Sequence, residues 1–157
     1  MTARVPKVNL EHQANGGILR YLRSGSKGHS QPSAAPEDIQ NPYYDLGTHP
    51  EIVARIWDEI TVKLTTDCRC VVYGAPALVH PESGIIFGFA GGTQTYALRL
   101  PEPERREAIR KGAEQVHTYM DGSKLDLKDF GKEWVFGGWF DIEAEWCLAA
   151  YEFAGNP

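Results

Sequence analysis

Apolar side chains recur at helical spacing in two parts of the chain, and this pattern predicts two amphipathic helices. The first is expected between residues 50 and 64, with an apolar stripe made of Ile52, Val53, Ile56, Trp57 and Ile60. Pro50 suits the first turn of this helix, because a backbone N–H is not needed there. The second is expected after Asp141, with an inward side made of Ile142, Trp146, Ala149, Ala150 and Phe153.

Short apolar runs separated by turn residues predict an antiparallel sheet in the middle of the chain. The expected strands cover residues 70–73, 77–80, 85–90 and 93–100, followed by shorter ones at 116–120 and 134–136. The links between 77–80, 85–90 and 93–100 are too short for a parallel crossover, so these strands should form a meander. A further helix, from Pro101 to Lys111, begins with acidic and ends with basic side chains, as the helix dipole favours. The pattern predicts the α+β class: an antiparallel β-meander sheet with helices packed on one face.

The first 41 residues differ from the rest of the chain in composition and charge. Residues 1–30 hold five basic side chains and one acidic one, whereas residues 31–157 hold 11 basic and 20 acidic ones. The stretch 24–42 is rich in Ser, Gly, Pro and Ala and lacks apolar periodicity. The apolar run 17–23 could form one helical turn or an extended strip, since its glycines disfavour a long helix. We therefore expect an irregular basic N-terminal arm or linker at 1–41, lying across an acidic surface of a single α+β domain at 42–157.

Length, charge and hydropathy argue against several classes of protein. A chain of 157 residues suits one domain with one sizeable core. Its net charge of −5 argues against a dedicated nucleic-acid-binding protein, which usually carries a basic surface. No apolar run approaches the roughly 18 residues of a membrane span, and the N-terminus lacks the apolar core of a signal peptide. Three cysteines are too few for a disulfide framework, so the expected location is the cytoplasm.

The cysteines and histidines form no recognisable catalytic or metal-binding pattern. Cys68 and Cys70 are separated by one residue, whereas zinc ligands usually pair across two to four, so buried thiols are the favoured interpretation of both and of Cys147. His80 could act as a base beside Cys70 or Ser83, but no third orienting group stands at a recognisable spacing. An exposed turn residue is the favoured interpretation of His80. We expect no metal, no cofactor and no catalytic residue.

Binding is the chemistry that the remaining side chains favour. Trp134 and Trp139 belong to the densest aromatic cluster of the chain, which suits a ligand pocket or protein interface as well as a core. Arg99 lies between two leucines on a strand, so it should face the open side of the sheet. An arginine beside tyrosines can bind an anion or an acidic partner. The candidate binding residues are therefore Tyr73, His80, Tyr96, Arg99, Trp134 and Trp139.

From Tyr73 to about Gly122 the order of these features resembles the N-terminal domain of the TfoX family. The resemblance rests on the run Tyr73–Ala77 entering a strand, on the run Tyr96–Glu102 (YALRLPE) after the meander, and on the run Tyr119–Gly122. It covers about a third of the chain. It implies an α+β fold and a regulatory role, which in that family is proposed for natural competence. No enzymatic residues are established in the family, so the resemblance also implies a non-enzymatic protein.

Two functional hypotheses remain open. The first is a non-enzymatic binding or regulatory domain that contacts another protein or a second copy of itself, as a homodimer, through an exposed sheet face or edge strand. The alternative is a small-molecule-binding protein or small enzyme with a pocket near Tyr73, His80, Arg99 and Trp139. Binding of nucleic acid through the basic arm is disfavoured, because the acidic body would repel phosphates.

Overall fold

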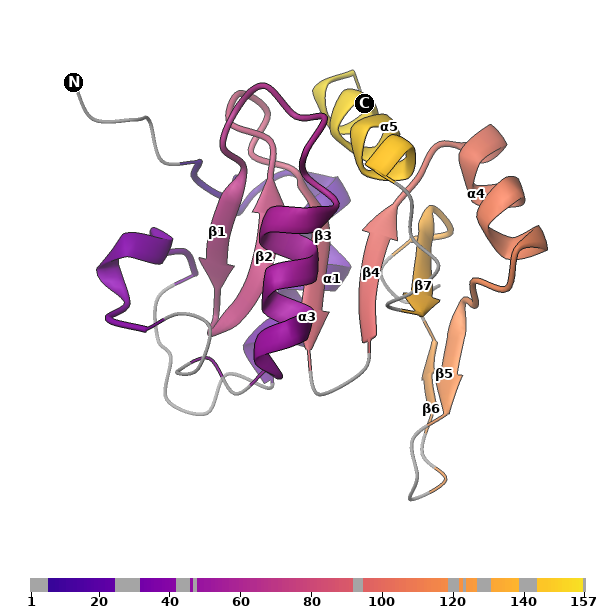
Figure 1. Ribbon diagram of the computed structural model, residues 1–157, viewed down its shortest axis with the longest axis horizontal. Helices are drawn as coiled ribbons and strands as arrows, with labels where there is room; N and C mark the ends of the chain where they lie inside the picture. Colours follow the sequence, from indigo (N-terminus) through magenta and orange to yellow (C-terminus); the bar gives the residue numbers. More distant parts are fainter. Residues whose placement is uncertain are drawn as a thin grey trace.

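A five-stranded antiparallel sheet lies at the centre of the structure, a computed structural model that describes residues 6–24, 32–41, 46, 48–91, 95–118, 122, 124–126, 131–138 and 144–156. Figure 1 shows its strands side by side, in the order β1 (Arg69–Val72), β2 (Ala75–Val79), β3 (Ile86–Gly91), β4 (Thr95–Arg99) and β7 (Trp134–Gly138). Each strand is antiparallel to its neighbours, which confirms the predicted meander and the α+β class. A separate two-stranded sheet pairs β5 (Val116–Thr118) with β6 (Lys124–Asp126).

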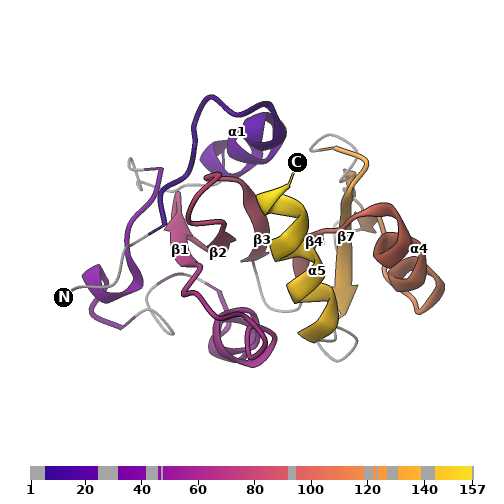
Figure 2. The same ribbon diagram turned by 90° about the horizontal axis from the view of Figure 1, so that it is seen from above.

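Helices pack on both faces of the sheet (Figure 2). One face carries α3 (Pro50–Ala54), which continues as a π-helical turn, η3 (Arg55–Glu59). The same core cluster includes α5 (Ala144–Gly155), which lies across the upper end of the sheet in Figure 1. The opposite face carries α1 (Gly16–Ser24), where the sequence left open one helical turn or an extended strip. Helices therefore cover both faces of the sheet and not one face as expected.

The side chains of β2 show how one sheet serves two cores. Leu78 belongs to the cluster beneath α3 and α5, whereas Ala77 and Val79 belong to the cluster beneath α1. The remaining helices lie at the periphery: α4 beside β7, and two short 3-10 helices near the N-terminus. Their bounds are Glu102–Arg110 for α4, Gln13–Asn15 for η1 and Pro36–Asp38 for η2.

The N-terminal segment is attached to the sheet by apolar burial. Ile18 and Leu22, one turn apart on α1, are both buried in the cluster beneath α1, which we call the second core cluster. This packing offsets the poor helix propensity of Gly16 and Gly17, because tertiary contacts supply most of the stability of a short helix. The prediction of an irregular arm on an acidic surface is therefore wrong for residues 16–24, which form a helix on an apolar sheet face.

A buried asparagine fixes where this segment crosses the sheet. Asn15 is fully buried, and its side-chain Nδ2 donates to the backbone oxygens of Asn9 and Gly84 at 2.8 and 2.9 Å. Its Oδ1 accepts a hydrogen bond from the backbone N–H of Ile86 at 2.9 Å. The side chain thus links the N-terminal segment to the turn before β3, and it satisfies polar groups that are cut off from water.

Replacing Gly84 with alanine is expected to lower the free energy of unfolding by at least about 1–2 kcal/mol. Gly84 has a φ of +73°, and an added Cβ would lie 2.7 Å from the backbone N and from the Cβ of Asn9. Gly112 is a matched control, because its φ is +111° but an added Cβ meets nothing within 4 Å. Urea unfolding should show a larger loss for Gly84→Ala than for Gly112→Ala. Equal losses would contradict the crowding against Asn9.

Candidate functional site

The structure divides the predicted binding residues between the two ends of the sheet. His80 follows β2, Arg99 ends β4 and Trp134 begins β7, so these three lie at the end that α5 covers. Tyr73 lies in the turn between β1 and β2, at the opposite end. The residues of β2 separate Tyr73 from His80 by about 16 Å at the usual rise of a strand. The structure therefore does not bring Tyr73 together with His80 and Arg99.

His80 is a buried hydrogen-bond acceptor beneath the last helix. The residue is 6% exposed, and its ring stacks on Tyr151 of α5 with centroids 4.8 Å apart. Its Nδ1 accepts hydrogen bonds from the backbone N–H groups of Glu82 and Ser83, at 3.1 and 3.2 Å. Burial lowers the pKa of His80, and the charge of Glu82 opposes this shift. The prediction of an exposed turn residue is wrong, and an Nδ1 already occupied by two amides is poorly placed to act as a base.

We expect His80 to make the folded protein less stable as the pH falls from about 7 to 5. Because its pKa is lower in the folded than in the unfolded chain, the unfolded chain takes up the proton first. The stabilisation is complete above the unfolded pKa and is lost as the pH falls through the folded one. His80→Asn offers an oxygen to the same two amides and cannot titrate. Its urea midpoint should fall less steeply over this range, and identical slopes would contradict the prediction.

Arg99 was expected to face the open side of the sheet, but it is buried at the end of β4. It is 7% exposed, and its guanidinium carbon lies 4.3 Å from the ring centroid of Phe153 in α5. Within the described part of the chain, its Nη1 finds no hydrogen-bond acceptor. Desolvation lowers the pKa of Arg99, and the charge of Glu133 opposes the shift. Phe153 comes from the C-terminal part of α5, which in Figure 2 points toward the α1 side of the sheet.

Two more of the predicted residues belong to the core. Tyr96 is fully buried in the cluster beneath α3 and α5. Trp134 is fully buried in the cluster beneath α1, with its ring centroid 5.6 Å from that of Phe89. Both side chains are therefore enclosed by the fold, and neither is presented to a ligand. Trp139 lies outside the described residues.

The thiols have the chemistry of core side chains. Cys68, Cys70 and Cys147 are free and buried. Burial raises the pKa to about 12 for Cys68 and Cys147, and to about 11 for Cys70. The thiolate, which is the nucleophilic and metal-binding form, is therefore scarce at neutral pH. Across the described ranges, no group of three or more His, Cys, Asp or Glu side chains could hold a metal ion.

An open hollow of about 680 Å³, which we call the α1 hollow, is lined by Leu10, Leu19, Arg20, Arg23 and Tyr73. Its size is within the range of small-ligand sites. Leu10 is 54% exposed, and Leu19 is half-buried against the second core cluster. Arg20 and Arg23 are exposed, and neither forms an ion pair or hydrogen bond with a described residue. The hollow thus combines apolar side chains with two cations that the rest of the described structure leaves without a carboxylate.

Tyr73 enters this hollow from a strained turn. Val72 pairs with Ala75, so Tyr73 and Gly74 form a two-residue hairpin loop, with φ of +47° and +85°. Positive φ at both positions is the type I′ pattern, which favours Asn or Gly over a bulky residue. Among the described residues other than glycine, Tyr73 alone has a positive φ. Backbone strain of this kind costs about 1–3 kcal/mol and clusters at functional sites.

Sequence reasoning identified only Tyr73 among the residues of the α1 hollow. It missed Leu10, Leu19, Arg20 and Arg23, because residues 1–41 were interpreted as an irregular arm. A signal was nevertheless present in the basic excess of residues 1–30. The excess of basic side chains predicts a cationic surface in this part of the chain. Only the fold shows which of its residues line the same hollow as Tyr73.

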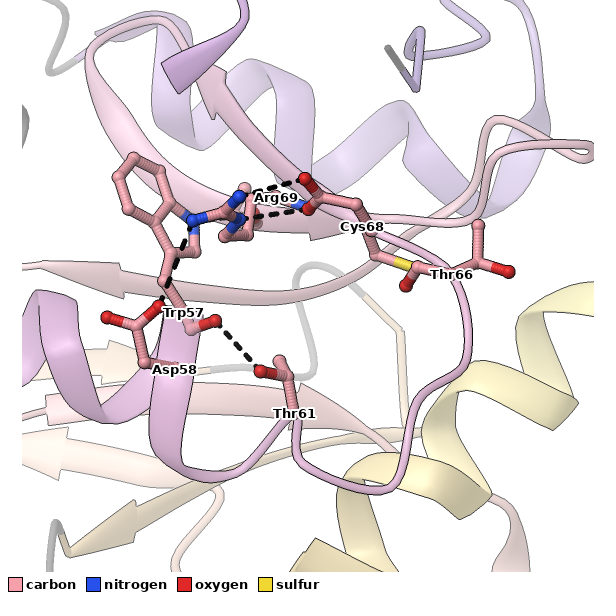
Figure 3. A network of polar contacts seen from close by, with 8 residues as sticks. Trp57, Asp58, Thr61, Thr66, Cys68 and Arg69 are labelled. Carbon is pink, nitrogen blue, oxygen red and sulfur yellow. Dashed lines mark hydrogen bonds and ion pairs between the residues drawn. The ribbon is translucent and has the colours of Figure 1, made fainter. Parts of the chain in front are cut away.

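A second hollow, of about 390 Å³, lies where η3 leads into β1, and its charged groups are paired with one another. Asp67 receives two bonds of 2.9 Å from Nε and Nη2 of Arg69, and Asp58 lies 3.8 Å from Nη1 of the same guanidinium (Figure 3). The hydrogen bond from Arg69 holds the pKa of Asp67 below its ordinary value. The lining consists of Trp57, Asp58, Thr61, Leu64, Thr65, Thr66, Asp67, Cys68 and Arg69. Because Arg69 is already paired with two carboxylates, this hollow is a weaker candidate for binding a charged ligand than the α1 hollow is.

Both edges of the sheet carry backbone groups that are already bonded within the chain. At the β1 edge, Val71 and Ala34 exchange two backbone hydrogen bonds of 2.9 Å. At the β7 edge, Phe136 and Glu114 exchange bonds of 2.6 and 3.0 Å. Groups bonded in this way cannot serve as a template for a strand of another molecule. The α1 hollow is therefore a stronger candidate interface than either edge strand.

In the part of the chain that the structure describes, no helix combines the length and apolar character needed to cross a membrane. The resemblance to the TfoX family stays a prediction. No family model matches the chain, and neither a curated protein nor a solved structure matches it.

Proposed function

We propose that this chain is a cytoplasmic, non-enzymatic binding domain that acts through contact with a partner protein, and that the α1 hollow is its binding site. The observation that carries the proposal is the pair Arg20 and Arg23, which border an apolar hollow without a carboxylate partner among the described residues. Exposed cations beside apolar surface match a partner that supplies both an apolar side chain and negative charge. A regulatory role, which the TfoX resemblance implies, is consistent with such a site.

The chemistry of the titratable groups supports binding over catalysis. The thiol pKa values near 11 and 12 disfavour nucleophilic attack, and the Nδ1 of His80 is engaged by backbone amides. Free cysteines are also typical of proteins from reducing compartments, which supports the cytoplasmic location. A second copy of the chain is another partner consistent with the charges, because residues 31–157 are acidic.

Site-specific photo-crosslinking tests this function in cells that make the full chain. A benzoylphenylalanine in place of Leu10, which is exposed in the α1 hollow, should give a protein adduct. The same group in place of Val62, which is 71% exposed on the loop after η3, is the control and should not. The double substitution R20E/R23E should remove the adduct. An adduct that forms equally at both positions, or that survives the double substitution, would contradict the proposal.

A small amphiphilic anion is the second candidate ligand, because the volume of about 680 Å³ suits a small molecule. This candidate retains the Tyr73 part of the predicted small-molecule pocket and does not include His80 or Arg99. In titration calorimetry with the full chain, dodecanoate should bind with a stoichiometry near one and lose affinity in R20E/R23E. Failure to bind, or binding that is insensitive to the double substitution, would remove it.

A further inference from the structure

The charge and shape of the α1 hollow specify a class of partner segment. We infer that the hollow binds a short acidic segment of a protein, in which one large apolar side chain stands beside two carboxylates. This inference rests on the proposed function and names the chemistry of the partner. The apolar side chain would lie against Leu10, Leu19 and Tyr73, and the carboxylates would pair with Arg20 and Arg23.

The spacing of the two arginines sets the spacing of the two carboxylates. Arg20 and Arg23 are three residues apart on α1, so they are neighbours on the helix surface, with Cβ atoms about 5–6 Å apart. Leu19 is four residues from Arg23 and shares that side of the helix. Carboxylates separated by three or four positions in a helix, or by two positions in a strand, are about 5–7 Å apart. The segment should therefore carry acidic residues two to four positions apart.

Tyr73 gives the hollow an aromatic wall in a defined place. The positive φ of Tyr73 disfavours this residue in the turn, and its half-buried side chain packs against the second core cluster. A tyrosine combines a large apolar surface with a hydroxyl group and has few rotatable bonds, which is why it is common where binding energy is concentrated. Its position beside the two arginines allows one partner residue to contact an aromatic ring and a cation together.

The overall charge of the chain favours a short partner over an extended polyanion. Residues 31–157 are strongly acidic, so a long anionic surface such as nucleic acid would be repelled by the body. A segment of a few residues interacts electrostatically mainly with charges within about 8 Å at physiological salt. Arg20 and Arg23 line the hollow itself, and neither forms an ion pair with a described carboxylate.

A display library of random 12-residue peptides, selected against the purified full chain, tests this inference. We expect enrichment of peptides with Asp or Glu two to four positions apart beside Leu, Phe, Tyr or Trp. The best peptide should lose affinity about tenfold or more in R20E/R23E, since each charge pair that is lost and replaced by repulsion weakens binding. Selection against R20E/R23E should enrich Lys and Arg at the same spacing. Arg20 and Arg23 are exposed, so the variant should keep the thermal midpoint of the parent. R106E/R110E changes two exposed arginines of α4 and is the control that should leave binding unchanged.

The outcomes separate the inference from the proposed function. Enrichment of uncharged or basic peptides, or of the same acidic peptides with the parent and with R20E/R23E, would overturn the acidic segment. If the crosslink at Leu10 nevertheless forms and depends on the arginines, the binding function stands and only the class of partner is wrong. If the library gives no acidic motif while dodecanoate binds, the occupant is a small amphiphile and the inference fails.

Discussion

Replacing Trp57 with alanine is expected to lower the free energy of unfolding by about 3–5 kcal/mol, the largest loss that we predict for one side chain. Trp57 is 2% exposed in the cluster beneath α3 and α5, so truncation leaves a large cavity. Its Nε1 donates to the backbone oxygen of Ala77 at 3.0 Å, which ties η3 to β2. Its own backbone oxygen accepts a bond from Oγ1 of Thr61 at 2.8 Å, at the start of the loop that Figure 3 shows.

Two further variants separate the packing of Trp57 from its hydrogen bond. Trp57→Phe keeps most of the ring and removes the donor to Ala77, so it should cost about 1–2 kcal/mol. Val62→Ala changes an exposed residue five positions away and should stay within about 0.5 kcal/mol of the parent. Urea unfolding followed by circular dichroism measures all three. A loss for Trp57→Ala no greater than that for Trp57→Phe would contradict a core role for the indole.

The core beneath α3 was predictable because it depends on local periodicity. Ile52, Ile56, Trp57 and Ile60 are all buried, as their spacing predicts. The π-helical turn is not visible in that pattern, because Ile52, Ile56 and Ile60 recur every four residues, as they would in an uninterrupted α-helix. The structure reveals it through the bond from the N–H of Ile60 to the oxygen of Arg55, five residues earlier.

The second helical face was not predictable because its determinants are distant in the sequence. Asn15 bonds to Gly84 and Ile86, which lie 69 and 71 residues away. No local pattern reports such pairing, and Gly16 and Gly17 argue locally against a helix. The consequence for function is direct: treating residues 1–41 as an irregular arm removed Arg20 and Arg23 from the candidate site.

The exposure of two candidate residues was misjudged for a related reason. His80 and Arg99 end or follow strands, which locally favours exposure, yet both are covered by α5. Tyr151 covers the first and Phe153 the second. The expected helix after Asp141 included Phe153 among its inward residues, but its docking across the end of the sheet depends on tertiary packing. Periodicity identifies the buried side of a helix and does not identify the surface against which it packs.

Replacing Asn15 with alanine is expected to cost about 2–3 kcal/mol of stability and to weaken binding at the α1 hollow without changing its lining. The substitution removes three hydrogen bonds and leaves the N–H of Ile86 without its acceptor in a fully buried position. Asn15 immediately precedes α1, so its loss should loosen the helix that carries Arg20 and Arg23. Urea unfolding measures the loss of stability. Faster hydrogen exchange at the amide of Ile86 reports the loss of its acceptor.

Asn9→Ala is the matched control, because the one described donor to the side-chain oxygen of Asn9 is the exposed N–H of Glu11, at 3.0 Å. It should stay within about 0.5 kcal/mol of the parent.

Asn15→Asp keeps an acceptor for Ile86 but places carboxylate oxygens against the oxygens of Asn9 and Gly84, so it should be at least as destabilising as alanine. If Asn15→Ala leaves the exchange of Ile86 and the affinity for selected peptides unchanged, α1 is not held by this side chain. If the affinity falls together with protection of that amide, the docking of α1 and the binding function are properties of one structural unit.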